Sequence, residues 1–307
     1  MKAVAYGYPC DFKFLILGDG RKNTAHVFPV CCRRAKIICY GLCVYISELS
    51  QETIKLEKMK RSAPVVFSIT FVRHGETQAN KEQRIQGHLD IPLSSVGEIQ
   101  ASQAGMSLCK AAFSRVYASD LCRAYTTCER ILKENCCLPP PIKVDTRLRE
   151  RNFGSVEGMN IEEVKTMAAA EGLTWPQFNP EGAETLGALQ ARMASFFKDV
   201  CQSVFDKNRH QRGEGNEDTD DIDVENLQPL EESAPVENIL VVSHGAALKQ
   251  LFVHLHKTLS CPVPGDPDIL NRIPPNTGIT EYLVRFSPKR YMLQCVRMHD
   301  DGHLQDL

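Results

Sequence analysis

Two apolar runs that each end in a histidine constrain the fold more than any other feature of this 307-residue sequence. Residues 65–72 read VVFSITFV and are followed by Arg73 and His74, while residues 238–243 read NILVVS and are followed by His244. Uninterrupted β-branched and aromatic runs are typical of strands buried on both faces of a parallel sheet. Because ligands bind at the carboxyl ends of such strands, we expect both histidines at one edge of the sheet.

Helical and extended patterns alternate along the rest of the chain. Apolar residues at helical spacing predict helices over residues 96–108, 123–134, 161–171, 185–205 and 246–256. Extended patterns predict strands over 114–119 and 142–148, and a closing antiparallel hairpin from 280–286 and 291–298. We therefore predict an α/β fold with three layers, α/β/α, in which a mostly parallel central sheet carries an antiparallel edge strand.

Composition divides the chain into an organised domain and two less regular segments. Residues 1–65 combine clustered cysteines and basic residues without a clear period, so we interpret them as an N-terminal extension of unknown role. The organised domain spans residues 66–307. Within it, residues 206–237 predict a disordered acidic insert, because residues 214–232 contain acidic residues, no Lys or Arg, and few hydrophobic residues.

Charge, hydropathy and cysteine usage exclude several classes of protein. The 36 basic and 38 acidic residues give a formal net charge of -2, so no overall field would attract nucleic acid or an anionic membrane. The longest apolar stretch near the N-terminus, residues 37–46, has about half the length that a membrane-spanning helix requires, so we expect no membrane insertion. The 13 cysteines lack metal-ligand spacing, and we expect reduced thiols and a cytoplasmic location.

The residues at the strand ends suit the binding and transfer of a phosphoryl group. A neutral imidazole is a competent nucleophile toward phosphorus when a backbone carbonyl holds its second ring nitrogen, which makes His74 the candidate. Arg73 and Arg123 offer planar forks that match phosphate oxygens. Positive donors around a transferring phosphoryl group supply most of the catalysis, and His244, if protonated, would add one. The expected partners are small phosphorylated metabolites.

Four motifs resemble, in their order and wording, those of the histidine phosphatase, or phosphoglycerate mutase-like, superfamily. They are RHGET (73–77), SDLCRA (119–124), LRERNFGSVEG (148–158) and VVSHG (241–245). Four ordered motifs are far more specific than a lone RHG, which chance supplies often. The resemblance covers about residues 66–300 and implies the fold of that superfamily.

The resemblance also implies a role for each matching residue. By it, His74 is the phosphohistidine nucleophile, Arg73, Arg123 and His244 form the phosphate pocket, and Glu150 is the proton donor. A leaving alkoxide needs a proton as the P–O bond breaks, and a protonated carboxyl group can give it and then activate water. No cofactor is expected. No metal is expected either, because an arginine beside His74, Glu150 and His244 would repel a cation.

Residues next to these motifs are candidates for substrate binding. Those that follow the first motif either line the substrate end of the pocket or shape a surface loop. The two arginines that flank Glu150 would favour its charged form if they pointed inward, so we expect at least one to face solvent or a second substrate phosphate. The predicted substrate-binding residues are Asn80, Arg84, Gln86, Gly87, Arg149 and Arg151.

Within the superfamily, the chain resembles the fructose-2,6-bisphosphatases in its SDLCRA and LRERNFGSVEG motifs, its polar insert and the PNTG turn at 275–278. This resemblance implies hydrolysis of fructose-2,6-bisphosphate, and of 2,3-bisphosphoglycerate or related phosphoesters, which would lower glycolytic flux. It also implies a link to apoptosis and association with the nucleus or mitochondrion. The loop 86–94 is closer to the general phosphatase and mutase branch, and Ala183 replaces the usual second glycine of EGAET.

Two alternatives remain open at the level of the sequence. The first is a phosphoglycerate mutase, which would hold the phosphoryl group on His74 and return it to another hydroxyl group. The second is a regulator without catalytic activity, in which the acidic insert or the basic N-terminal segment binds a protein partner. Release of free phosphate from the substrate separates the first alternative from a phosphatase.

Overall fold

The computed structural model describes residues 14–18, 25–29, 64–175, 177–211, 229–230 and 233–305. The chain forms two compact units, Met1–Arg61 and Ser62–Leu307. In the first unit, strands β1 (Phe14–Gly18) and β2 (Ala25–Pro29) pair in antiparallel orientation. The rest of the predicted N-terminal extension, apart from its last two residues, lies outside the described residues.

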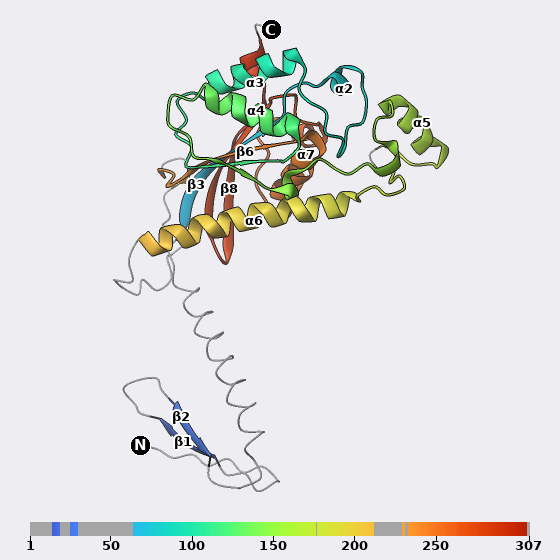
Figure 1. Cartoon of the computed structure of the whole chain (residues 1–307). Helices are drawn as coiled ribbons and strands as arrows, with labels where there is room; N and C mark the ends of the chain where they lie inside the picture. The colour runs from blue at the N-terminus through green and yellow to red at the C-terminus, as the bar shows by residue number, and fades with distance from the viewer. Residues whose placement is uncertain are drawn as a thin grey trace. The chain divides into compact units, whose positions relative to one another are not determined.

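A six-stranded sheet forms the centre of the second unit, in the order β5-β4-β6-β3-β7-β8 (Figure 1). The first four strands of this order run parallel, whereas β7 is antiparallel to β3 and the edge strand β8 is antiparallel to β7. The predicted mostly parallel sheet with an antiparallel hairpin at its edge is confirmed. The bounds are β3 Val65–Arg73, β4 Arg115–Ala118, β5 Ile142–Val144, β6 Asn238–Ser243, β7 Ile279–Ser287 and β8 Arg290–Asp300.

Helices cover both faces of this sheet, as the predicted three layers require (Figure 1). Helices α3 (Ser95–Ser107) and α4 (Cys122–Lys133) pack on one face, and α6 (Leu186–Gln211) and α7 (Gly245–Val253) pack on the other. The shorter helices are α2 (Gln78–Lys81), α5 (Ile161–Ala170), the π-helical turn η5 (His254–Thr258) and the 3-10 turns η1 (Thr146–Leu148), η2 (Gly154–Val156), η6 (Pro267–Asn271) and η7 (Gly302–Leu304).

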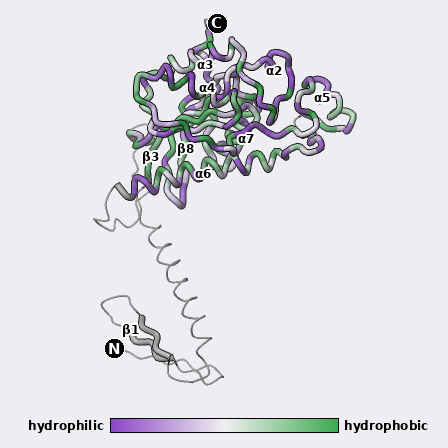
Figure 2. Tube along the Cα trace, viewed as in Figure 1, coloured by the Kyte–Doolittle hydropathy of each residue, from purple (hydrophilic) through white to green (hydrophobic). Residues whose placement is uncertain are grey.

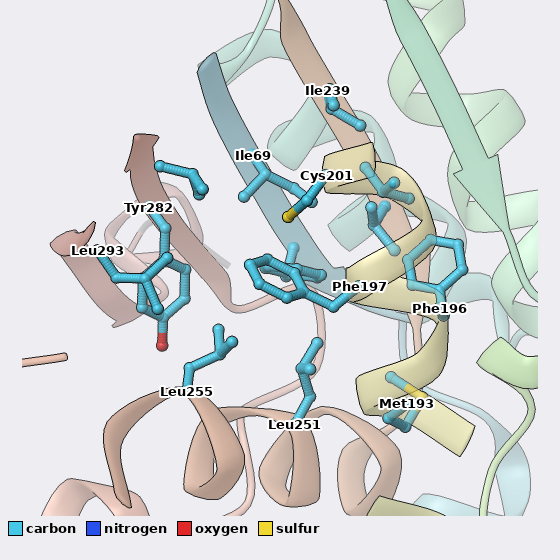
Figure 3. Close-up of a cluster of buried hydrophobic side chains, with 14 of the residues drawn as sticks. Ile69, Met193, Phe196, Phe197, Cys201, Ile239, Leu251, Leu255, Tyr282 and Leu293 are labelled. Atoms are coloured by element: carbon cyan, nitrogen blue, oxygen red, sulfur yellow. The ribbon is translucent and has the colours of Figure 1, made fainter. Parts of the chain in front are cut away.

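The larger of the two main hydrophobic clusters lies between the sheet and the α6–α7 layer (Figure 3). Phe197 of α6 lies among Ile69 of β3, Tyr282 of β7 and Leu251 of α7. Hydrophobic residues gather along the central strands in Figure 2. Burial of these side chains removes apolar surface from water and holds the strand ends at fixed positions.

The register of β3 against β6 brings the two histidines to one edge. Arg73 lies opposite Ser243, so His74 and His244 follow directly at the same level of the sheet. The backbone N–H of His74 donates to the carbonyl of Ser243 at 2.9 Å, which extends the parallel pairing to the nucleophile candidate itself. The expectation that both histidines meet at the carboxyl edge is therefore confirmed.

The predicted limits of the acidic insert, 206–237, are wrong at both ends. Helix α6 continues to Gln211, and beyond the composition break the Asn208 side chain donates to the Val204 carbonyl at 2.9 Å. At the other end, Glu237 is 5% exposed and forms ion pairs with Arg115 and Lys207. A buried carboxylate needs such partners, which composition alone does not reveal. Residues 212–228 and 231–232 lie outside the described residues.

Two smaller predictions differ from the structure. The strand predicted over 142–148 ends at Val144, and the η1 turn follows because the Asp145 side chain accepts the Arg147 backbone N–H at 2.9 Å. The helix predicted over 246–256 begins one residue earlier and ends in the η5 turn. No helix within the described residues has the length and apolar character needed to cross a membrane.

Candidate active site

His74 is held in a defined orientation at the end of β3. Its Nδ1 lies 2.7 Å from the carbonyl oxygen of Gly75, which can only accept, so Nδ1 carries the proton and Nε2 keeps its lone pair. The side chain is buried, with 2% of its surface exposed. Burial, and then the charges of Arg73 and Arg123, hold the pKa of His74 well below its ordinary 6.5. A buried neutral imidazole with a free Nε2 is the form that attacks phosphorus.

The backbone after His74 bends tightly around the site. Gly75 allows this bend, because a Cβ atom there would lie 2.4 Å from the carbonyl oxygen of Gly97. The Gly75 N–H donates to Thr127 Oγ1 at 3.0 Å, and that hydroxyl donates to the Arg123 carbonyl at 2.7 Å. The loop that carries the nucleophile is thus tied to the helix that carries an arginine of the pocket.

Two buried arginines lie beside His74. Arg73 donates through Nη1 to the Pro274 carbonyl at 2.7 Å, and burial lowers its pKa to about 10. Arg123 donates to the carbonyls of Leu89 and Gly87 at 2.7 and 2.8 Å, and burial lowers its pKa as well. The Nε–H groups of both arginines are buried, and within the described residues neither has a hydrogen-bond partner. Unsatisfied buried donors are costly, and phosphate oxygens would satisfy them.

His244 lies next to His74, with the ring centroids 5.2 Å apart, but it does not itself line the pocket. It is the N-cap of α7 and is fully buried, and neither ring nitrogen has a hydrogen-bond partner within the described part of the chain. Burial, together with Arg123, His74 and Arg73, lowers the pKa of His244 well below 6.5. His244 is therefore neutral without a bound anion, and the expected protonated donor requires the negative charge of a bound phosphate.

Glu150 lies against the N-terminus of α7, beside the two histidines. Its Oε2 accepts from the Ala246 N–H at 3.0 Å, while its Oε1 accepts from the N–H groups of Ala247 at 3.0 Å and Arg151 at 2.7 Å. A helix N-terminus binds negative charge through these free amides. The carboxyl group is thereby fixed at the wall of the pocket, which it lines together with His74, Arg73 and Arg123.

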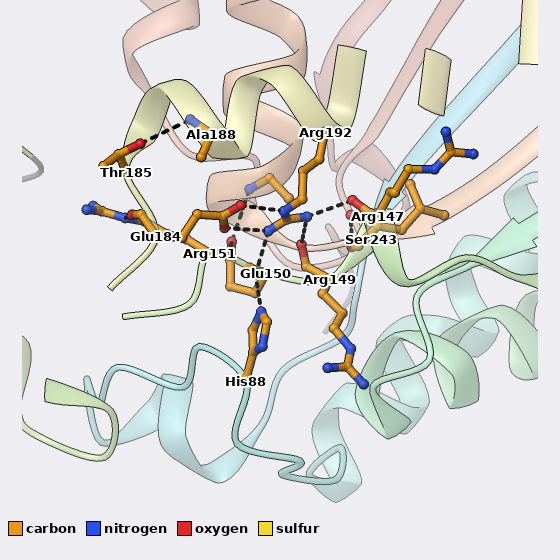
Figure 4. Close-up of polar contacts among 12 residues, drawn as sticks. His88, Arg147, Arg149, Glu150, Arg151, Glu184, Thr185, Ala188, Arg192 and Ser243 are labelled. Carbon is orange, nitrogen blue, oxygen red and sulfur yellow. Dashed lines mark hydrogen bonds and ion pairs between the residues drawn. The ribbon is translucent and has the colours of Figure 1, made fainter. Parts of the chain in front are cut away.

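Arg192 of α6 fixes the chain segment that carries Glu150 (Figure 4). Its guanidinium donates to the carbonyls of Arg147, Arg149 and Glu150 at 2.6, 2.7 and 2.8 Å. Its remaining two N–H groups form a bidentate ion pair with the two carboxylate oxygens of Glu184, at 2.7 and 2.8 Å. All its hydrogen-bonding directions are used within the protein, so Arg192 is a structural support for the site.

The pocket has a volume of about 600 Å³, in the range of small-molecule sites. Of the predicted substrate-binding residues, the structure brings Asn80, Arg84, Gln86, Gly87 and Arg151 to its wall. Among these, Arg84 is half-exposed and also pairs with Glu82 at 3.0 Å.

Arg149 does not line the pocket, contrary to the prediction. Its guanidinium donates to both carboxylate oxygens of Asp120, at 2.8 Å from Nε and 2.5 Å from Nη2. The flanking arginine Arg151 instead turns inward, where it is 1% exposed and donates to the Glu184 carbonyl at 2.8 Å and to Asn179 Oδ1 at 2.9 Å. The side chain of Arg149 is directed away because Asp120, in the neighbouring motif, offers a paired acceptor.

The two departures from the family pattern are accommodated by the backbone. Gly182 takes the left-handed conformation with φ +72°, so its neighbour Ala183 is not the residue that needs glycine at this turn. In the loop 86–94, Gly87 has φ +51°, and the Asp90 carboxylate accepts the Cys122 N–H at 2.7 Å. Together with Arg123, this contact joins the loop to the start of α4.

Several residues of the pocket wall were not predicted, although one of them, Phe153, lies within the LRERNFGSVEG motif. The outer wall contains Phe153, Trp175 and Lys165 from the α5 region, and Lys249 from α7. Phe153 and Trp175 stack with centroids 5.5 Å apart. Trp175, Lys165 and Lys249 lie outside the four motifs and at irregular spacing, so no sequence pattern could connect them before the fold was known. Among the described residues, no group of three histidine, cysteine, aspartate or glutamate side chains could hold a metal ion.

Comparison with known proteins matches the chain to one family. The model of the histidine phosphatase superfamily (branch 1) matches residues 69–208. The mouse protein fructose-2,6-bisphosphatase TIGAR is 36% identical over 262 residues, which cover 78% of this chain and 96% of the mouse protein. Phosphoglycerate mutase-like protein 4 of Arabidopsis thaliana is 30% identical over 190 residues, 60% of this chain and 69% of that protein.

Solved structures share the same fold. Native mycobacterial glucosyl-3-phosphoglycerate phosphatase is similar with a TM-score of 0.54 and 26% identity, and the alignment covers 74% of this chain and 97% of that one. Phosphoglycerate mutase from Bacillus anthracis has a TM-score of 0.58 at 20% identity, with 80% of this chain and 97% of that one covered. The latter likeness concerns the fold alone.

Proposed function

Because the chain belongs to the histidine phosphatase superfamily and is a phosphoric monoester hydrolase, we propose that it hydrolyses fructose-2,6-bisphosphate through a phosphorylated His74. The observation that carries the chemistry is a neutral His74 whose Nε2 keeps its lone pair, next to buried arginine Nε–H groups that have no hydrogen-bond partner among the described residues. The substrate follows from the fructose-2,6-bisphosphatases that are 36% identical over nearly their whole length. We include 2,3-bisphosphoglycerate and related phosphoesters as further substrates.

In the first step, His74 Nε2 attacks the phosphorus atom and the bond from phosphorus to the sugar oxygen breaks. Glu150 donates a proton to the leaving oxygen as this bond breaks. The Nε–H groups of Arg73 and Arg123 bind equatorial phosphate oxygens. His244 gains its proton as the anion enters and becomes a further donor.

In the second step, Glu150 takes a proton from water, and the resulting hydroxide attacks the phosphorus of phosphohistidine. The N–P bond breaks, Nε2 recovers its lone pair, and inorganic phosphate leaves. Because His74 Nδ1 remains bonded to Gly75, the ring returns to the same orientation for the next turnover. Asn80, Arg84, Gln86, Gly87 and Arg151 contact the sugar and its second phosphate from the pocket wall.

We assign this activity to residues 66–307 and give no role to the extension 1–65. Hydrolysis of fructose-2,6-bisphosphate would lower glycolytic flux and link the enzyme to apoptosis through cellular metabolism. We place the enzyme in the cytoplasm, and we infer association with the nucleus or mitochondrion from the resemblance to the fructose-2,6-bisphosphatases. The described cysteines support a reducing compartment, because all of them are free thiols.

The test is a substrate panel with wild type and His74→Ala. Fructose-2,6-bisphosphate, 2,3-bisphosphoglycerate and simple monophosphates are each assayed for free phosphate, and labelled phosphate on the protein is trapped by rapid quench. We expect the highest kcat/KM with fructose-2,6-bisphosphate and no label or turnover in His74→Ala. Negligible phosphate release with label returned to a second hydroxyl would instead favour the mutase.

The non-catalytic alternative makes a different prediction in cells. If His74→Ala altered glycolytic flux as strongly as wild type does, a partner-binding role would replace the enzymatic one. The complete set of pocket residues supports the enzymatic reading, since a binding regulator would need neither a neutral nucleophile nor a nearby carboxyl group.

A further inference from the structure

Thr277 adopts a conformation that non-glycine residues rarely take. Its φ is +54°, in the left-handed region, and its side chain is fully buried. A β-branched residue in this region is strained, and such a conformation persists only where the surrounding contacts impose it. Strained positions of this kind gather at functional sites, so the contacts of Thr277 are informative.

The turn that contains Thr277 forms hydrogen bonds with the backbone of Arg73 and His74. The Thr277 N–H lies 3.1 Å from the Arg73 carbonyl and 3.3 Å from the His74 carbonyl. Asn276 Nδ2 donates to the same His74 carbonyl at 3.0 Å, and the Gly278 carbonyl accepts the Arg73 N–H at 3.4 Å. Both carbonyls at the end of β3 are therefore held by one turn.

A histidine near the end of the described chain holds this turn in place. His303, in η7, has its Nε2 3.0 Å from Thr277 Oγ1, and the Thr277 hydroxyl lies 2.8 Å from the Asn276 carbonyl. The hydroxyl has one proton, and the carbonyl can only accept it. His303 therefore donates from Nε2 to the Thr277 hydroxyl, and this hydroxyl in turn donates to the Asn276 carbonyl in the backbone of the turn.

The short η7 turn presents His303 in the required direction. The Leu304 N–H donates to the Asp301 carbonyl at 2.8 Å, and the Gly302 N–H donates to Asp300 Oδ1 at 3.1 Å. Asp300 ends β8, so the position of His303 is fixed by the edge of the sheet. Since imidazole and imidazolium both donate from Nε2, this contact does not depend on the protonation of His303.

We propose that His303 is a positioning residue for the nucleophile, acting through Thr277 on the peptide that joins Arg73 and His74. This inference rests on the proposed reaction at His74. The ring of His74 is oriented by its hydrogen bond to the Gly75 carbonyl, the next one along the chain. A shift of the peptide between Arg73 and His74 would therefore move Nε2 relative to the phosphorus atom. A displacement of about 1 Å costs roughly 100-fold in rate.

The experiment is a double-mutant cycle in the full-length protein. His303→Leu removes the donor, and Thr277→Val removes the hydroxyl while keeping the side-chain shape. The rate of His74 phosphorylation is measured by rapid quench with fructose-2,6-bisphosphate, together with kcat and KM. We expect each single variant to lower the phosphorylation rate and kcat about tenfold, with KM within about twofold of wild type.

The double variant decides whether the two residues act through one contact. We expect it to be no slower than the single variants, whereas independent structural damage would multiply to about 100-fold. His303→Gln, which retains an N–H donor, should recover most of the rate, and the pH profile should keep its shape. His254→Leu, at the C-cap of α7, is the matched control and should behave as wild type.

Two outcomes would overturn the proposal while leaving the function intact. One is a wild-type phosphorylation rate in folded His303→Leu, and the other is multiplicative loss in the double variant. If His303→Leu does not fold, equal rates for Thr277→Val and Thr277→Ser have the same meaning, because only serine retains the hydroxyl. If wild type forms no phosphate bond at His74, the proposed function fails first and this inference fails with it.

Discussion

The two histidines of the site occupy equivalent places at the ends of β3 and β6, yet their surroundings differ. His74 has one ring nitrogen bonded to Gly75 and its backbone held by the turn 275–278, so it is oriented before any substrate arrives. His244 is equally buried, but within the described residues neither ring nitrogen has a partner. The difference fits the proposed roles, in which His74 attacks phosphorus and His244 binds a phosphate oxygen.

The strongest test of this comparison removes the imidazole ring of His244. In His244→Ala, we expect kcat/KM to fall about 100- to 1000-fold, because a donor to the transferring phosphoryl group is lost. Slow labelling of His74 should persist, since its own contacts remain, and rapid quench measures this. A loss of less than about fivefold would mean that the two histidines do not divide the work in this way.

A substitution of Arg192 tests the contacts that hold Glu150 against the N-terminus of α7, next to His244. It fixes Glu150, and the Glu150 carboxyl group binds the first amides of α7, the helix that His244 caps. We expect Arg192→Met to lower kcat about tenfold, measured under steady-state conditions with thermal unfolding as a stability check. Arg192→Lys should fall in between, because an ammonium group replaces only part of the planar fork.

Equal kcat values in Glu150→Gln and in Glu150→Gln/Arg192→Met would place the whole effect of Arg192 in Glu150. If Arg192→Met retained full kcat, the support that Arg192 gives to residues 147–150 would be unnecessary for the reaction.

Arg149 marks the limit of the pocket. Because its guanidinium is bound to Asp120, we expect Arg149→Ala to change KM and kcat by less than about twofold. The same assay applied to Arg151→Ala should give a clearly larger KM, since that side chain lines the pocket. The reverse order of the two effects would restore Arg149 as a substrate-binding residue.

The smallest expected effect is that of mild acid on His74. With an ordinary pKa of 6.5, the neutral fraction would fall from about nine tenths at pH 7.5 to about one quarter at pH 6.0. Since the pKa of His74 lies well below 6.5, the neutral form persists and the phosphorylation rate should change less than about 1.5-fold. The rate is corrected for substrate ionisation, measured by phosphorus NMR. A fourfold loss would show that His74 titrates normally.

The sequence predicted most of the sheet and the centre of the pocket. The apolar runs before His74 and His244 identified the two central strands, because a run of residues buried on both faces is a local property of the chain. The limits predicted for the acidic insert were too wide because the order of its last residues is not a local property of the chain. Composition records polarity, whereas Glu237 is ordered by Arg115, which lies 122 residues away along the chain.

The sequence alone determined which residues are the candidates to attack and bind a phosphoryl group and to protonate the leaving oxygen, since RHGET, SDLCRA, LRERNFGSVEG and VVSHG each place them within a few residues. Only the tertiary structure decided how they are held. Arg192 lies 42 residues from Glu150, and Asn276 lies 202 residues from His74. Contacts at such separations form when the packed sheet and helices bring the segments together, and no local pattern encodes them.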